Sequence, residues 1–466
     1  MYKIPDFKRI DPFLMSINSA DNHWMYISST GCLTAGRKQA KYALFPYVTD
    51  DILHQNARST GPSTHILVKQ NNKKHLWQPF SDQIESYKKE QNLYKNSLGN
   101  KIVFEEINHS LGLTFLYSWQ ASSKYGFVKK TKLINHSEVK LNIKLIDGLR
   151  NILPAGLELR TQQEMSNLAN AYKVSECNPD YNYALYYMNA LLMDKPDPGE
   201  SLFSNMVWSL SEEKFELSVN QKSINTFLNN QCFTSDLLIK GKEGSFLNYI
   251  EKSLDQGDEM CWYIVADVQK SQSDIIGIIS DLKEHYTLKD KLEESILDNH
   301  FEFEKNIGMA DGFQCTNNDM NDLHHTANVT YNVLRGGIFS DNYNIQKTSL
   351  VSFLKVRNKN IFETYNDDIS KLPDTFSIED LKEFSDRSND PTLRRICREY
   401  LPLTLGRRHG DPSRPWNHFN IITKDSNNQP VLYYEGNWRD IFQNWEALGL
   451  SYPYSWESMI CIFLNA

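Results

Sequence analysis

The stretch Val139-Lys-Leu-Asn-Ile-Lys-Leu-Ile-Asp-Gly-Leu-Arg-Asn-Ile-Leu-Pro-Ala-Gly156 says most about the fold of the N-terminal part of the chain. From Val139 to Leu145, an apolar side chain at every second position alternates with lysine or asparagine. A period of two is that of a strand with one face buried and one face solvated. The stretch therefore predicts a half-buried β-strand.

Similar runs lie on both sides of this stretch. Apolar residues alternate in the same way from Leu113 to Trp119. Further β-type runs are Lys101–Ile107, Tyr183–Met193, Leu202–Leu210 and Met260–Val268. Many strands without intervening helices favour antiparallel sheets that pack as a sandwich, and we expect this sandwich to occupy residues 1–270.

The pattern changes to a helical one near Ser271. Residues Asp274–Tyr286 carry an apolar stripe at helical spacing, and Thr287 followed by Asp290 predicts the start of a second helix. Ser377 and Asp380 repeat this capping pattern. Further helices are expected at Asp319–Arg335, Thr348–Tyr365, Ile378–Phe384 and Tyr452–Ala466.

Composition excludes several classes of protein. The 466 residues are enough for two or three domains, and a net charge of −8 argues against nucleic-acid binding, which needs a basic surface. We find no apolar run long enough to cross a bilayer and no secretory signal. The seven cysteines are scattered without a CxxC pair, which favours a reducing, cytoplasmic environment and no zinc site.

The densest polar cluster is the loop Gly406–Asn417, which glycines and prolines interrupt. Its arginines offer paired donors for an anion or for vicinal hydroxyls, and its aspartate and tryptophan could bind and stack on a sugar. The residues concerned are Arg407, Arg408, Asp411, Arg414 and Trp416. A surface loop with internal ion pairs explains the same residues equally well.

A second cluster lies at Tyr433–Glu446. Apolar residues at helical spacing predict a helix that begins near Asn437, with Asp440 in its first turn. Capping of this helix would by itself explain why Asn437 and Asp440 occur at these positions. In the functional interpretation, Glu435 and Asp440 flank a cleft beside Trp438. A carboxylic acid there, with its pKa raised by burial, could protonate a glycosidic oxygen.

Two further signals have simpler explanations. The pair Gly336 and Gly337 follows a helical run, and a helix C-cap is the favoured interpretation. His324 and His325 have no Asp, Glu or His partner at metal-ligand spacing, so no metal site is predicted.

Together these segments resemble glycoside hydrolase family 94, the group of cellobiose phosphorylase and cyclic β-1,2-glucan synthase relatives, and especially its large uncharacterised bacterial members. The resemblance rests on His23–Asp51, Asp147–Gly156, Asn332–Phe339, Arg407–Asn417 and Glu435–Leu448. It implies an α+β multidomain protein with an N-terminal antiparallel super-sandwich (residues 1–270), a helical linker (271–310) and part of an (α/α)6 barrel (311–466).

The resemblance also implies a function. The protein would act on glycosidic bonds of an oligosaccharide or β-glucan by an inverting mechanism, with Glu435 or Asp440 as the acid. Substrate would be held by Arg407, Arg408, Asp411, Arg414, Trp416 and Trp438. No metal or organic cofactor is implied, although inorganic phosphate would be a co-substrate of a phosphorylase. Neither a nucleic acid nor a membrane is an expected partner. A homodimer is compatible with the sequence, which does not determine the oligomeric state.

One departure from the family pattern leaves alternatives open. The phosphorylases carry their acid in a Gly-Asp-Trp-Asn-Asp loop, and here Gly436-Asn-Trp-Arg-Asp440 places Asn437 at that position. An amide cannot act as the acid. Either Glu435 or Asp440 has taken the role, or the catalytic chemistry differs, or the protein does not catalyse that reaction and binds carbohydrate without cleaving it. The resemblance also implies more barrel than the chain holds, which predicts an N-terminal portion or a fragment of a split gene.

Overall fold

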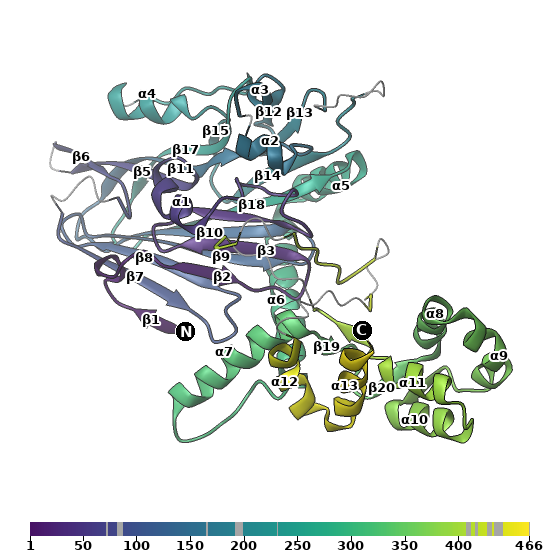
Figure 1. The fold of residues 1–466 in the computed structure, drawn as a ribbon. Coiled ribbons are helices and arrows are strands. Elements are labelled where there is room, and N and C mark those ends of the chain that lie inside the picture. The colour runs from purple at the N-terminus through teal and green to yellow at the C-terminus, as the bar shows by residue number, and fades with distance from the viewer. Residues whose placement is uncertain are drawn as a thin grey trace. The chain divides into compact units, whose positions relative to one another are not determined.

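The computed structural model describes residues 1–70, 73–81, 87–164, 166–191, 199–230, 232–406, 412–414, 418–425, 431–432 and 441–465. The chain divides into two compact units (Figure 1). The first comprises Met1–Glu302 and Gly410–Phe419, and the second comprises Phe303–His409 and Asn420–Ala466.

Two large antiparallel sheets form the first unit. Among the described residues, the larger sheet has ten strands in the order β1 (Tyr2–Ile4), β7 (Lys89–Lys95), β8 (Ile102–Asn108), β9 (Leu113–Ser122), β10 (Gly126–Asn135), β18 (Glu259–Lys270), β14 (Ser204–Ser211), β13 (Tyr183–Met188), β12 (Lys173–Asn178) and β16 (Leu238–Lys240). In the same described part, the smaller sheet has the order β15 (Glu216–Ser218), β17 (Gly244–Leu254), β11 (Leu141–Ile152), β5 (Gly61–Gln70) and β6 (Lys73–Trp77). A third sheet contains β2 (Leu14–Ile17), β3 (His23–Ser28) and β4 (Leu33–Arg37).

One hydrophobic core joins these sheets. Phe115 and Trp262 from the larger sheet and Leu145 from the smaller sheet belong to the same cluster, and all three are fully buried. The strands alternate as their sequences predict: β8 buries every second residue. The expected α+β class with large antiparallel sheets is therefore confirmed at this level.

Helices cover the outer faces of both sheets. The amphipathic helix α4 (Lys222–Asn230) packs Ile224 and Phe227 against β5, β11 and β17, beside which it lies in Figure 1. On the larger sheet, α5 (Gln272–Lys283) and α6 (His285–Met309) cover residues that include Trp208 and Val265. Side chains on both faces of these sheets are thus buried.

Several sequence predictions for this unit were wrong in detail. Short helices lie between strands where none was expected, at α1 (Asp50–Gln55), α2 (Leu159–Glu164), α3 (Ser166–Asn170) and α4. Val139 precedes β11 and is 44% exposed. Thr287 does not cap a helix, because α6 begins at His285 and the Thr287 hydroxyl donates to the Glu284 carbonyl.

The second unit contains a compact helical segment. Its helices are α8 (Lys347–Arg357), α9 (Lys359–Ser370), α10 (Ile378–Arg387) and α11 (Pro391–Glu399), with the strand pair β20 (Asn344–Gln346) and β21 (Thr375–Ser377). Leu350, Ile369 and Ile396 belong to one core that these helices share. Strands β19 (Ile338–Phe339) and β22 (Leu403–Thr404) pair antiparallel, so the two ends of the segment lie side by side.

Among the described residues, the second unit also contains the end of α6 from Phe303 onward and the helices α7 (Asp319–Gly336), α12 (Ile441–Ser451) and α13 (Trp456–Leu464), the last of which follows the 3₁₀ turn η4 (Pro453–Ser455). Helices α7 and α12 meet closely, since the Trp445 indole N–H donates to the Gly336 carbonyl over 2.9 Å. Gly337 ends α7 at a φ of 84°, which confirms the predicted C-cap.

The helix predictions here have mixed outcomes. The capping box of Ser377 and Asp380 starts α10 as expected. The single helix predicted for Thr348–Tyr365 is two helices, because the Asn358 side chain caps α9 by accepting from the Ile361 N–H. Helix α11 was not expected, and the helix predicted for Tyr452–Ala466 begins only at Trp456.

A membrane-spanning helix is not found within the described ranges, since none of their helices combines enough length with enough hydropathy.

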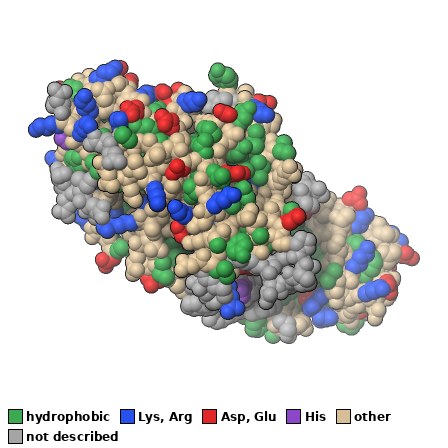
Figure 2. Space-filling view, turned by 90° about the horizontal axis from the view of Figure 1, so that it is seen from above, with side chains coloured by type: hydrophobic (Ala, Val, Ile, Leu, Met, Phe, Trp, Pro, Cys, Tyr) green, Lys and Arg blue, Asp and Glu red, His purple; other side chains and the backbone are tan. Residues whose placement is uncertain are grey.

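On the face shown in Figure 2, lysine and arginine side chains are interspersed with aspartate and glutamate.

Candidate functional site

Most of the predicted site residues lie outside the described residues: Arg407, Arg408, Asp411, Trp416, Glu435, Trp438 and Asp440. Arg414 is described and is exposed. A few residues later, Phe419 is buried against Trp24 and Tyr47 of the first unit, with ring centroids 5.7 and 6.0 Å apart. That the Arg-rich loop and the Glu435 segment meet in one cleft stays a prediction.

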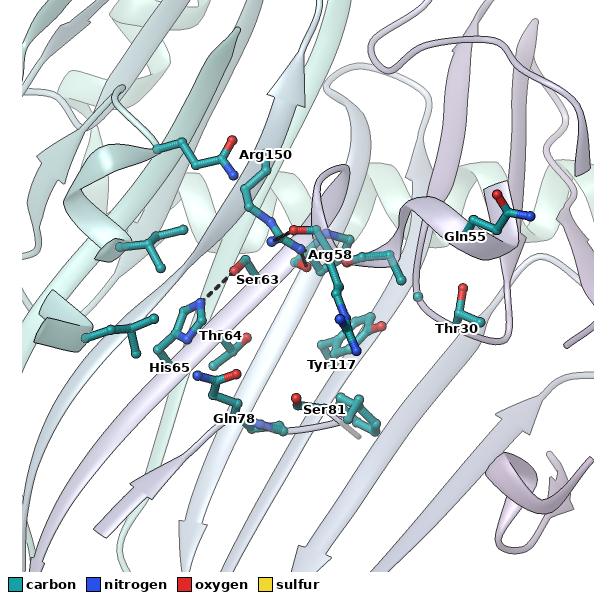
Figure 3. A pocket seen from close by; sticks show the side chains of 18 of the residues that line it. Thr30, Gln55, Arg58, Ser63, Thr64, His65, Gln78, Ser81, Tyr117 and Arg150 are labelled. Atoms are coloured by element: carbon teal, nitrogen blue, oxygen red, sulfur yellow. Dashed lines mark hydrogen bonds between the residues drawn. The ribbon is translucent and has the colours of Figure 1, made fainter. Parts of the chain in front are cut away.

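The described part of the first unit holds a polar cavity of about 380 Å³ (Figure 3). It opens beside β5, and Ser63, Thr64 and His65 follow one another along that strand. The other walls come from helices α1 and α4, the 3₁₀ turns η1 (Phe7–Arg9) and η2 (Asn56–Arg58), the β3–β4 turn, strands β9 and β11, and the residues after β6. Besides the three residues of β5, the polar residues that line the cavity are Lys8, Thr30, His54, Gln55, Arg58, Gln78, Ser81, Tyr117, Arg150, Gln221 and Asn225.

Arg150, near the end of β11, contributes a partly buried cation to the lining. Its guanidinium donates to three backbone carbonyls: those of Ala57 at 2.8 Å, Pro62 at 3.3 Å and Arg58. Burial lowers the pKa of Arg150 to about 10, so the group is still charged at neutral pH. Its Nε finds no hydrogen-bond partner within the described part of the chain.

His65 lies on the neighbouring strand β5 and is 8% exposed. Its Nε2 shares a hydrogen bond of 3.0 Å with the Ser63 hydroxyl, drawn as a dashed line in Figure 3. Burial first, and then the charge of Arg150, lower the pKa of His65 to about 4. The ring is therefore neutral at pH 7, and Nδ1 has no partner among the residues described.

A buried ion pair lies behind the cavity and links the two sheets. Asp147 on β11 and Lys129 on β10 are completely buried, and both carboxylate oxygens lie 2.7 Å from Nζ. The carboxylate also accepts from the Trp262 indole at 2.8 Å and from the Thr64 hydroxyl at 2.7 Å. Burial lowers the pKa of Lys129, and Asp147 opposes that shift.

The described lining of this cavity contains no aspartate or glutamate. Glycoside hydrolysis in most families needs a pair of such carboxyl groups. The lining offers instead guanidinium, hydroxyl and amide groups, which suit an oxygen-rich ligand.

This cavity was not predicted from the sequence, because its residues come from elements far apart in the chain. One signal was available at Asp147. The alternation that buries Leu141, Ile143 and Leu145 places Asp147 on the same face, two residues further on. A buried carboxylate requires a partner, so the pattern indicated a polar centre inside the unit.

A comparison with protein families matches residues 339–402 to the family model "Glycoside hydrolase family 149 insertion domain 1". The matched residues include the helical segment α8–α11 with its own core, and they end beside the β19–β22 pair. The match supports a protein of the glycoside hydrolase or phosphorylase type, which is coarser than the resemblance to family 94. A search of curated proteins finds no match.

Solved structures share low similarity with the chain. A polysaccharide lyase is 10% identical, with a TM-score of 0.32 and coverage of 58% of this chain and 34% of that protein. A bacterial glucoamylase complexed with acarbose is 11% identical, with a TM-score of 0.40 and coverage of 97% of this chain and 57% of that protein. A family GH92 α-mannosidase from Bacteroides thetaiotaomicron is 10% identical, with a TM-score of 0.28 and coverage of 52% and 28%. The chain thus spans between 28% and 57% of the length of these proteins.

Proposed function

We propose that the chain is part of a carbohydrate-active protein of the glycoside hydrolase or phosphorylase type. Its substrate would be an oligosaccharide or β-glucan, and the reaction would follow an inverting course. The observation that carries this proposal is the match of residues 339–402 to an insertion domain of a glycoside hydrolase family. The compact core of that segment and its paired ends are the features expected of an inserted domain.

In the proposed mechanism a carboxylic acid protonates the leaving oxygen of the glycosidic bond. Glu435 and Asp440 are the candidates for this acid, because Asn437 cannot donate the proton. In a hydrolase a second carboxylate would activate water on the opposite face of the sugar. In a phosphorylase, inorganic phosphate would attack instead. Arg407, Arg408, Asp411, Arg414, Trp416 and Trp438 would hold the substrate.

A second candidate function is carbohydrate binding without catalysis. Asn437 favours it, because the family pattern has an aspartate at that position. The two candidates make different predictions for turnover and the same prediction for binding.

The test uses the purified chain with β-linked gluco-oligosaccharides, with and without inorganic phosphate, and follows the anomeric protons of the products by NMR. We expect Glu435→Gln or Asp440→Asn to reduce turnover at least a hundredfold, the lower end of what general acid–base catalysis contributes. The control is Glu446→Gln, which changes an exposed carboxylate on α12 and should leave turnover unchanged.

Full turnover in both carboxylate variants would exclude both residues as the acid. Saturable binding without any product would support the non-catalytic candidate. A chain that neither binds nor converts any member of the panel would contradict both.

A further inference from the structure

We propose that the cavity of the first unit is a binding site for a small anionic sugar, one that carries a phosphate or a carboxylate group. The anion would lie against the arginines, and the hydroxyls would contact the polar side chains along β5 and α4. The residues that line this cavity are different from those proposed for catalysis, and all of them belong to the first unit.

The charge of the lining favours an anionic ligand. Arg58 and Arg150 line the cavity, and no acidic side chain does so within the described residues. The hydrogen bonds of the Arg150 guanidinium to Arg58, Ala57 and Pro62 are to neutral carbonyls, so they do not neutralise its positive charge. A partly buried cation without a counter-charge is costly, and an anionic ligand would remove that cost.

Two buried polar atoms at the cavity have no hydrogen-bond partner within the described ranges. They are Nδ1 of His65 and Nε of Arg150. Buried polar groups in folded proteins are nearly always hydrogen-bonded, so each of these atoms needs an explanation. His65 is more than nine-tenths buried and neutral at pH 7, so Nδ1 can donate or accept according to its tautomer.

The size and the mixed polar and apolar walls of the cavity suit a sugar. A volume of about 380 Å³ lies in the lower range of small-molecule sites. Hydroxyl and amide groups face the cavity from several elements, among them Thr30, Ser63, Gln78 and Asn225. The rings of Phe80 and Tyr117, 5.5 Å apart, and the side chain of Ile224 add apolar surface. Such mixed walls suit a ring that carries hydroxyls on its edge and C–H groups on its faces.

The anionic part of this inference rests on the cavity alone, whereas the sugar part also rests on the proposed carbohydrate function. A binding assay separates the two. A chain that binds anionic sugars but cleaves no glycoside would support the site and contradict the enzymatic proposal.

The test is isothermal titration calorimetry on the full chain with four probes: glucose 6-phosphate, glucuronate, glucose and inorganic phosphate. We expect at least one of the two anionic sugars to bind at least tenfold more tightly than both glucose and inorganic phosphate. Arg58→Gln should weaken that binding about tenfold, the size of one charge-assisted hydrogen bond. Arg58 is exposed, and within the described residues its guanidinium makes no hydrogen bond or ion pair, so its replacement should leave the fold intact.

A second variant, Asn225→Asp, places a negative charge at an exposed position of the lining. This charge should repel the anionic sugar and so also weaken its binding. The control is Arg387→Gln, which removes the charge of a 79% exposed arginine on α10 and should change the affinity less than twofold. The proposal is wrong if neither anionic sugar binds or if Arg58→Gln binds as tightly as the unaltered chain. Equal affinity for glucose would refute the anionic part, and equal affinity for inorganic phosphate would refute the sugar part.

Discussion

A single residue, Asp147, links the two large sheets of the first unit. It joins the two sheets through Lys129 and Trp262 in a fully buried environment. We expect Asp147→Asn to lower the free energy of unfolding by about 3–5 kcal/mol, because it leaves the lysine buried without its counter-charge. Urea denaturation would measure this change.

The matched control is Asp255→Asn, which breaks the exposed ion pair with Lys140. A surface pair of this kind contributes about 1 kcal/mol or less. Equal effects of the two substitutions would show that the buried pair does not hold the sheets together.

His65 predicts a pH dependence of stability. Its pKa is about 4 in the folded chain and about 6.5 when unfolded, so the unfolded state binds more protons between these values. The contribution of neutral His65 to the free energy of unfolding is complete above pH 6.5 and is lost as the pH falls toward 4. The free energy of unfolding then changes by at most about 1.4 kcal/mol per pH unit. His65→Asn should therefore flatten the measured dependence in this window. Part of the slope should persist, because burial also lowers the pKa of His23, to about 3.

An unchanged slope in His65→Asn would mean that His65 titrates alike in the folded and unfolded chain. His109→Asn, at an exposed position beside Glu90, is the control for the substitution itself.

At the scale of elements, two helical glycines should respond in opposite ways to alanine. A Cβ on Gly336, at the end of α7, would meet the Asn444 carbonyl oxygen at 2.3 Å, so α7 and α12 would have to separate. We expect Gly336→Ala to destabilise the second unit by about 1–3 kcal/mol. A Cβ on Gly277, in α5, would meet nothing within 4 Å, and Gly277→Ala should stabilise by about 0.5–1 kcal/mol. Thermal unfolding of both variants checks this, and a shift of the same sign in both would contradict it.

The elements that sequence analysis predicted well are those whose signal is local. Alternation located β8, β9 and β11, and the Ser377–Asp380 pair located α10. Helices α1 to α4 are nine residues or shorter, too short for periodicity to reveal, and α4 depends on the sheet it covers. The cavity was not predictable because Arg58, His65 and Arg150 approach one another only through the pairing of β5 with β11.

At the scale of the whole molecule, residues 338–404 have the properties of an inserted unit. Their helices share one core, and their ends pair as β19 and β22. We therefore expect a polypeptide of residues 338–404 to fold by itself and to unfold cooperatively on heating. Circular dichroism would test this, and a gradual, non-cooperative loss of helical signal would show that the segment needs the rest of the chain.

The central claim is that this chain recognises carbohydrate. Calorimetric titration with a graded series of β-linked gluco-oligosaccharides tests it directly, because binding precedes any chemistry and does not depend on the identity of the acid. The account predicts saturable binding by at least one member of the series. The absence of a binding signal across the whole series, from a chain shown to be folded by its cooperative unfolding, would contradict it.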